Sequence, residues 1–133
     1  MKKFLLAFIV FFVFPNQVKS EHSSGNKELI IKTESTEHAL SLAKHLTKKG
    51  AVKYSAYWCP HCLHQGELFG KKAYKELTVV ECAPDGINSQ TQKCVDKKIK
   101  GFPTWEINGE LTIGVKSLKE LANESNFKRL NKS

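Results

Sequence analysis

The sequence predicts an α/β fold in which a central mixed sheet is flanked by helices. An apolar run over residues 51–57 leads directly into a C-x-x-C motif, Cys59 to Cys62, and helical spacing continues from there to about residue 77. Farther on, Asn108-Gly109 separates two short apolar runs, which is a strong signal for a β-hairpin. The 133 residues of the chain have room for one domain of this kind.

The first twenty residues have the pattern of a secretory signal peptide. Lys2 and Lys3 precede an apolar run over residues 4–14, and residues 18–20 place small side chains at the −3 and −1 positions before Glu21. The run is well short of the roughly 20 residues that a membrane-spanning helix needs, which favours cleavage. We therefore expect export to the periplasm or an equivalent oxidising lumen, with tethering by an uncleaved signal as the alternative.

Export also changes the charge of the protein. The whole chain has 21 basic and 13 acidic residues, a formal charge of +8. Loss of Lys2, Lys3 and Lys19 leaves 18 basic against 13 acidic residues, a charge of +5. The basic residues are scattered in pairs, so we expect no nucleic-acid partner and only a weak preference for acidic surfaces.

The mature chain divides into a polar leader over residues 21–34, a folded domain over residues 35–128 and a polar tail over residues 129–133. We expect the leader to be flexible, although its residues 28–33 could form a short edge strand or a packed arm. We expect Ser35 to cap the first helix of the domain, whose apolar positions recur on one face.

The elements that follow alternate between strand and helix. Residues 51–57 form a strand, and Gly66 and Gly70 in the next helix indicate close packing or a bend. In chain order, the remaining elements are a strand over 78–82, a turn over 83–86, a helix over 89–98, a strand ending at 107, its hairpin partner over 110–113 and a last helix capped by Ser117. A strand-helix-strand half followed by a strand-strand-helix half is the order of the thioredoxin fold, and C-x-x-C beside a strand-helix-strand pattern is its redox signature.

The C-x-x-C motif stands where a cysteine becomes reactive. Cys59 falls at a helix N-terminus, where free backbone N–H groups and the helix dipole stabilise a thiolate. Pro60 suits the first helical turn, and Cys62 lies three residues on, within reach of Cys59. A protonated His61 beside the Cys59 sulfur favours the thiolate further, and a stabilised reduced form makes the disulfide a better oxidant.

Other uses of this motif are a plain structural disulfide, a zinc site or a haem site. A c-type haem site needs histidine directly after the second cysteine, where this chain has Leu63. A zinc site built from Cys59, Cys62, His61 and His64 would need side chains from different faces of one helix to converge. The strand before the motif and the helix after it favour the redox use, and we expect no metal and no bound cofactor.

Three segments, residues 53–69, 81–86 and 101–109, resemble the thioredoxin-like domain that is fused to bacterial and plant vitamin K epoxide reductase homologues. The resemblance covers most of residues 36–123. Its most specific parts are Glu-Cys-x-Pro-Asp-Gly and Pro-Thr-Trp-Glu-Ile. In that family the domain relays disulfides between a quinone-linked membrane enzyme and exported proteins, so the resemblance implies partners of both kinds.

The resemblance implies a role for each matching residue. Cys59 would be the nucleophile and Cys62 the resolving cysteine, with Pro103 as a cis-proline facing them and Phe102 offering its backbone to the substrate. We expect Trp58 and Thr104 to complete this rim, with a plain core or rim role as the alternative for the aromatic residues Trp58, Phe102 and Trp105. Cys82 and Cys94 match the second cysteine pair of the domain. We expect this pair to form a structural disulfide, with a second redox pair as the alternative.

The chain departs from the related domains in two ways. No membrane enzyme is attached within this sequence, so such a partner would be a separate protein. Many thioredoxins carry a buried acid six residues before the first cysteine, where this chain has Lys53. The proton acceptor for Cys62 is thereby left open, with Glu81 or water as candidates.

Together these features predict a monomeric, exported thiol-disulfide oxidoreductase that forms disulfides in cysteine-containing exported proteins. An exported reductase or isomerase is the alternative enzyme. A non-catalytic binding module is a third possibility, which the intact cysteines disfavour.

Overall fold

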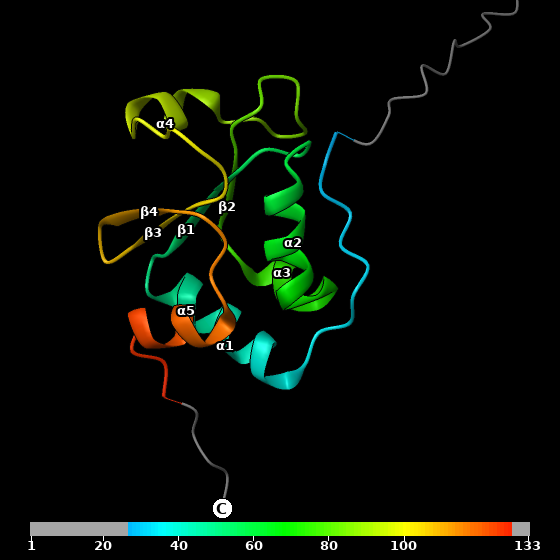
Figure 1. Ribbon diagram of the computed structural model, residues 1–133, viewed down its shortest axis with the longest axis vertical. Helices are drawn as coiled ribbons and strands as arrows, with labels where there is room; N and C mark the ends of the chain where they lie inside the picture. Colours follow the sequence, from blue (N-terminus) through cyan, green and yellow to red (C-terminus); the bar gives the residue numbers. More distant parts are fainter. Residues whose placement is uncertain (1–26, 129–133) are drawn as a thin grey trace, which may run out of the picture.

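The computed structural model describes residues 27–128, so the expected signal peptide, the start of the leader and the tail beyond 128 lie outside the described residues. Five helices and four strands make up this part of the chain (Figure 1). In chain order they are α1 (Glu37–Lys48), β1 (Val52–Ser55), α2 (Pro60–Phe69), α3 (Lys71–Glu76), β2 (Val79–Glu81), α4 (Thr91–Asp96), β3 (Thr104–Ile107), β4 (Glu110–Ile113) and α5 (Leu118–Glu124).

The four strands form one mixed sheet in the order β2-β1-β3-β4. β1 pairs in parallel with β2 and antiparallel with β3, which places Lys53 between Val79 and Trp105. β3 and β4 form the expected hairpin, and both residues of its turn, Asn108 and Gly109, have positive φ angles of 53° and 79°. The predicted mixed sheet with flanking helices is confirmed, and the fold is thioredoxin-like.

The two faces of the sheet are covered unequally. Helices α1, α2, α3 and α5 pack on one face, where Trp105 and Ile107 join the main hydrophobic core (Figure 1). The opposite face is covered by α4, next to a smaller cluster that includes Tyr54 and Val80. Because side chains alternate along a strand, Lys53 and Ser55 of β1 belong to the face that carries α2.

The helix expected from the C-x-x-C motif to about residue 77 is not continuous, because Gly70 divides it into α2 and α3, and the close packing expected at Gly66 and Gly70 is confirmed. Gly70 has φ +81°, and a Cβ atom there would lie 2.5 Å from the backbone of Glu34 and Ser35. Gly66 is also closely packed, since a Cβ atom there would lie 2.3 Å from the side chain of Ile31. The two glycines therefore let the segment before α1 approach this helical pair.

The segment before α1 forms a packed arm and no strand. Ile31 is buried, and the carboxylate of Glu67 accepts hydrogen bonds from the backbone N–H groups of Lys32 and Thr33 at 2.9 and 2.8 Å. These contacts hold part of the leader, which was expected to be flexible, against α2. Packed structure therefore begins before residue 35, where the folded domain was expected to start.

The cap of α1 also differs from expectation. Thr36, not Ser35, is the N-cap, and its hydroxyl accepts from the N–H of Ala39. The Ser35 hydroxyl instead accepts from the N–H of Ala73 in α3, at 2.8 Å. Either residue could cap a helix, and the long-range contact to α3 decides between them.

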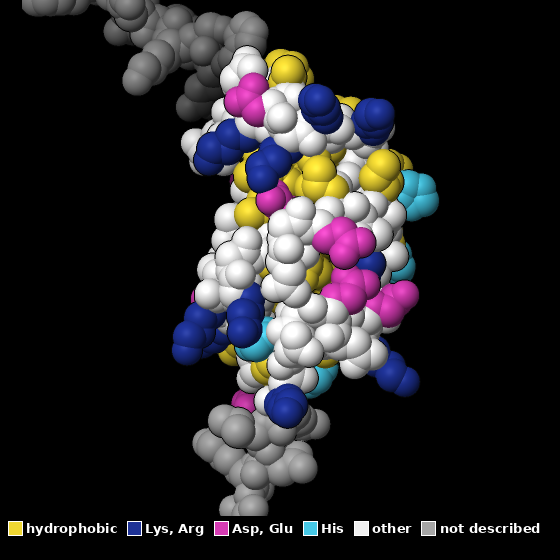
Figure 2. All heavy atoms as spheres, turned by 90° about the vertical axis from the view of Figure 1, so that its left-hand side faces the viewer, with side chains coloured by type: hydrophobic (Ala, Val, Ile, Leu, Met, Phe, Trp, Pro, Cys, Tyr) yellow, Lys and Arg dark blue, Asp and Glu magenta, His cyan; other side chains and the backbone are white. Residues whose placement is uncertain are grey.

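Charged side chains on the surface are distributed as the sequence predicts, without one continuous basic stripe on the face shown in Figure 2. On the face shown in Figure 2, Lys and Arg side chains occur in separate groups with acidic side chains between them. Among the described residues, no helix is long and apolar enough to cross a membrane.

Candidate active site

The first turn of α2 holds the Cys59–Cys62 pair at the end of the central strand β1. Cys59 is the N-cap residue with an extended backbone, and Pro60 follows as the first helical residue. Proline suits this position because its missing N–H would have had no partner inside the helix. The local sequence thereby starts the helix at Cys59, whose side chain makes no capping hydrogen bond to the helix.

The two cysteines are both free thiols with different surroundings. Cys59 keeps 6% of its surface exposed, whereas Cys62 is fully buried. Burial raises the pKa of the Cys62 thiol, while hydrogen bonds from Ser55 and the Ala56 backbone and the charge of Lys53 act against that rise. The geometry suits a pair in which Cys59 meets partners and Cys62 reacts only with Cys59.

The loop before β3 closes over Cys59. The Phe102–Pro103 peptide bond is cis, and the Cys59 thiol donates to the Phe102 carbonyl oxygen at 3.6 Å. The N–H of Gly114 donates to the Pro103 carbonyl at 2.8 Å, and the buried Thr104 hydroxyl donates to the Gly101 carbonyl at 2.6 Å. Pro103 and Thr104 are therefore buried supports of the loop, and Phe102 is the residue that meets the thiol.

Exposed side chains surround this point. Trp58 is 60% exposed, and its ring meets the half-buried Phe102 edge to face, with ring centroids 6.1 Å apart. His61 is exposed in the first turn of α2. Trp105 is buried instead, and its indole N–H donates to Gln65 at 3.0 Å, so it belongs to the core.

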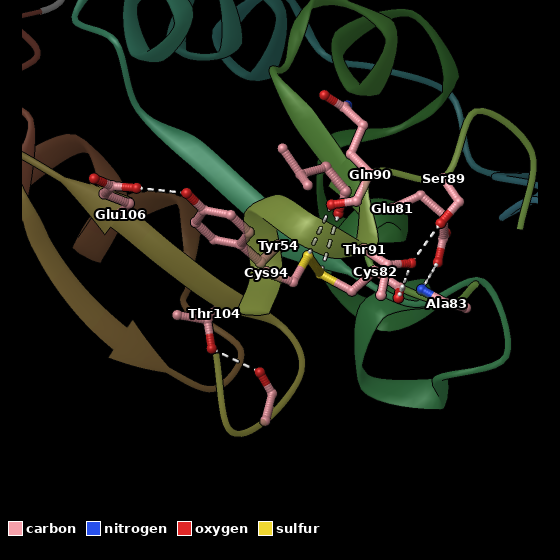
Figure 3. The surroundings of a disulfide bond; sticks show 12 residues. Tyr54, Glu81, Cys82, Ala83, Ser89, Gln90, Thr91, Cys94, Thr104 and Glu106 are labelled. Carbon is pink, nitrogen blue, oxygen red and sulfur yellow. Dashed lines mark hydrogen bonds between the residues drawn. A yellow bond between two sulfur atoms is a disulfide. The ribbon is translucent and has the colours of Figure 1, made fainter. Parts of the chain in front are cut away.

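Cys82 and Cys94 are joined by a disulfide that links the end of β2 to α4 (Figure 3). It lies on the α4 face of the sheet with Tyr54, whose hydroxyl donates to Glu106 at 2.7 Å. Thr91 ties the start of α4 to the Cys82 carbonyl at 3.1 Å. The bond thus holds α4 against the sheet, apart from the N-terminus of α2.

Two buried polar groups near the cysteines were not assigned from the sequence. The Gln65 amide accepts from Trp105 and from the Lys116 N–H, and donates to the Lys116 carbonyl, so it fixes α2 to the segment before α5. Lys53 is buried beside Cys62 with Ser55 and Tyr74 as partners. Lys53 stands within an apolar strand, and this position is the sequence signal from which its burial could have been predicted.

Glu81, a candidate proton acceptor for Cys62, is occupied elsewhere. Its carboxylate accepts from the Ala83 N–H at 2.8 Å, and Gly86 lies so close that a Cβ atom there would collide with the Glu81 side chain. Burial raises the pKa of the Glu81 carboxyl. Within residues 27–128, no three His, Cys, Asp or Glu side chains are grouped so as to hold a metal ion.

The sheet topology and the cysteine pair at the start of α2 define a thioredoxin-like domain with a dithiol site. The chain is similar to a curated protein of Arabidopsis thaliana named thiol-disulfide oxidoreductase LTO1, with 48% identity over 100 residues. The match covers 73% of this chain and 27% of that relative, so the chain spans about a quarter of the relative's length. No protein-family model matches the chain.

Proposed function

We propose that this protein is an exported thiol-disulfide oxidoreductase that forms disulfides in exported proteins through Cys59 and Cys62. The observation that carries the proposal is the placement of a slightly exposed Cys59 and a buried Cys62 at the N-terminus of α2, against the carbonyl that precedes Pro103. The similarity to a relative named for this chemistry supports it.

The reaction is an exchange of disulfides. A substrate thiolate attacks Cys59 of the oxidised pair, which forms a mixed disulfide and releases Cys62 as the leaving group. A second substrate thiolate then attacks the substrate sulfur of that bond, so the substrate leaves oxidised and the Cys59–Cys62 pair leaves reduced. The backbone of Phe102 offers hydrogen-bonding groups to an extended substrate segment, and Trp58 gives it an apolar contact.

The direction of transfer depends on how well the reduced pair is stabilised. The position of Cys59 at a helix N-terminus, with His61 in the first turn, is one that favours the reduced pair and hence donation of disulfides. An exported reductase or isomerase is the alternative with the same residues. The equilibrium of the pair with glutathione separates them, and a potential near the thioredoxin value of about −270 mV would contradict the oxidase proposal.

Single-cysteine variants test the assigned roles. Cys62→Ser should accumulate mixed disulfides with substrate proteins, because nothing inside the protein can release them, whereas Cys59→Ser should accumulate none. Both results are read on non-reducing gels of alkylated samples.

In the reduced wild-type protein, alkylation at mildly acidic pH should modify Cys59 before Cys62. Preferential modification of Cys62 would reverse the assignment, and absence of any dithiol exchange would favour a binding module.

We also propose a separate membrane protein as the source of oxidising equivalents. A dithiol oxidase acts once unless it is reoxidised, and the resemblance points to a quinone-linked vitamin K epoxide reductase homologue. Cys62→Ser expressed in the native host, with the N-terminal segment retained, should trap such a protein through Cys59. If only soluble substrates are trapped, and oxidation persists after deletion of the membrane enzyme, this partner is wrong.

A further inference from the structure

Lys53 is a fully buried lysine in the middle of the sheet. Burying an ammonium group without partners is costly, so its contacts are informative. Its amino group donates to the Ser55 hydroxyl at 3.1 Å, to the Tyr74 hydroxyl at 3.2 Å and, at 3.5 Å, to the Cys62 carbonyl. It also lies 4.9 Å from the centre of the Tyr74 ring. These partners hold the amino group beneath the first turn of α2.

The Ser55 hydroxyl lies next to this amino group and acts on the Cys62 thiol. Ser55 accepts a hydrogen bond from Lys53, and the same side chain opposes the rise in the pKa of Cys62 that burial causes. A hydroxyl can accept one proton while it donates another. The amine, the hydroxyl and Cys62 therefore lie together, closed off from solvent because all three residues are buried.

The charges around Lys53 make both of its protonation states accessible. Burial lowers the pKa of its amino group to about 8, against the opposing influence of Cys62, Cys59 and Glu81. The titratable groups that face it are thus the two cysteines of α2, Tyr74 of α3 and Glu81 of β2. Two of the groups that favour the charged form are the cysteines themselves, so their oxidation removes that stabilisation and makes Lys53 release its proton more readily.

We propose that Lys53, acting through the Ser55 hydroxyl, supplies the proton that Cys62 takes up and receives the proton that Cys62 gives away. The proposal rests on the dithiol function proposed above and adds the group that serves its buried cysteine. Lys53 reaches the sulfur through Ser55, so it is a positioning and proton-holding residue, while Ser55 contacts the reacting atom.

The steps balance in both directions. When a substrate thiolate attacks Cys59, the Cys59–Cys62 bond breaks and Cys62 leaves as a thiolate. The Ser55 hydroxyl passes its proton to that sulfur and is reprotonated by the Lys53 ammonium, which becomes a neutral amine. In the reverse direction the neutral amine withdraws the Cys62 proton through Ser55. The Cys62 thiolate then attacks Cys59 in the mixed disulfide, and the substrate thiolate leaves.

The test follows the two thiols separately with 5,5′-dithiobis(2-nitrobenzoate) in a stopped-flow instrument. Attack by Cys59 releases the first nitrothiobenzoate, and attack by Cys62 on the resulting mixed disulfide releases the second. We expect Lys53→Met and Ser55→Ala to slow the second release at pH 7 by about tenfold or more, within the range typical of proton-transfer catalysis. Lys53→Met should also move its pH profile upward, while the first release changes much less.

Lys75→Met is the matched control, because it removes an exposed lysine next to Tyr74 and should leave both releases unchanged. A second release within twofold of wild type in both Lys53→Met and Ser55→Ala, with an unshifted pH profile, would overturn the relay. A Lys53→Arg variant with the wild-type rate would do the same, since arginine keeps the charge and does not give up its proton near neutral pH. Failure of the wild-type protein to release a second equivalent would instead contradict the dithiol function itself.

Discussion

His61 lies between the two cysteines, exposed in the first turn of α2, while Lys53 lies buried on the other side of the pair. We therefore expect the two residues to act on different sulfurs. His61 belongs to the exposed rim near Cys59, and Lys53 contacts the Ser55 hydroxyl and the backbone of Cys62. In these proposals His61 influences the direction of disulfide transfer, and Lys53 influences the proton that the transfer moves.

Replacing His61 should make the disulfide harder to reduce. His61→Ala removes the side chain that we propose favours the reduced form, and each tenfold change in the equilibrium with glutathione corresponds to about 30 mV. The measurement is the fraction of reduced protein across glutathione buffers. The control is His64→Ala, because His64 is exposed one turn farther along α2, and it should change the reduction potential little. Equal potentials for His61→Ala and wild type would show that His61 does not tune the pair.

Lys53 should give the reduced protein a distinctive pH dependence of stability. Folding lowers the pKa of its amino group from 10.5 to about 8, so between these values the unfolded chain binds more protons than the folded chain. The stability that this shift contributes to the free energy of unfolding is therefore fully present above pH 10.5. It decreases as pH falls through the window and is lost below about pH 8. Urea unfolding of wild type and Lys53→Met at several pH values isolates it as the difference between them.

Lys53→Met should also be at least as stable as wild type at neutral pH. An apolar side chain of similar length removes the cost of burying an ammonium group in the sheet. If the variant is strongly destabilised at neutral pH, or if the pH-dependent difference is absent, the amino group is better solvated than its burial indicates.

The break between α2 and α3 positions the active-site helix against the arm that precedes α1. Gly70 allows the backbone of Glu34 and Ser35 to approach, and the arm in turn holds α2 through Glu67. The Ser35 hydroxyl bonds to the Ala73 N–H at the start of α3. Contacts at this junction therefore fix the helix whose first turn carries the cysteines.

Gly70→Ala should destabilise the protein more than Gly50→Ala does. Both glycines have positive φ, where an alanine costs roughly 1–2 kcal/mol. A Cβ atom at Gly50 meets nothing within 4 Å, whereas one at Gly70 collides with backbone atoms at 2.5 Å. Thermal unfolding of the two variants separates the conformational cost from the collision. Equal losses of Tm would mean that the arm moves away at little cost.

The molecule has a disulfide, Cys82–Cys94, and a free dithiol, Cys59 and Cys62, at different places around one sheet. The Cys82–Cys94 bond spans 12 residues and fastens α4 to β2, on the face away from the main core. That face has fewer covering helices than the other (Figure 1), so a covalent link supplies stability where apolar burial is smaller.

Removing both Cys82 and Cys94 should lower stability and leave dithiol chemistry in place. Closing a loop of about this length contributes roughly 3 kcal/mol in the chain-entropy model, which corresponds to a Tm loss on the order of 10 °C. Turnover with dithiothreitol below the new Tm should stay near the wild-type rate. Loss of turnover in a folded double variant would favour the alternative, a second redox pair that passes electrons to Cys59 and Cys62.

Much of the fold and the reactive pair could be predicted because local patterns encode them. The C-x-x-C motif after an apolar run, the Asn108-Gly109 turn and the helical faces all depend on neighbours within a few residues. The glycines indicated close packing or a bend in this helix, but the patterns did not show that it breaks at Gly70 or that Thr36 is the cap, because contacts between segments more than thirty residues apart decide both.

The sequence by itself therefore determined the order of elements and the dithiol, while the tertiary structure decided what surrounds it. Lys53 appeared in the sequence only as a departure from an expected acid, yet packing buries it beside Cys62 with Ser55 between them. The physical reason is that burial and hydrogen-bond partners depend on which strands and helices meet. Periodicity along the chain shows which face a residue occupies, but only the packed sheet shows which atoms that face contacts.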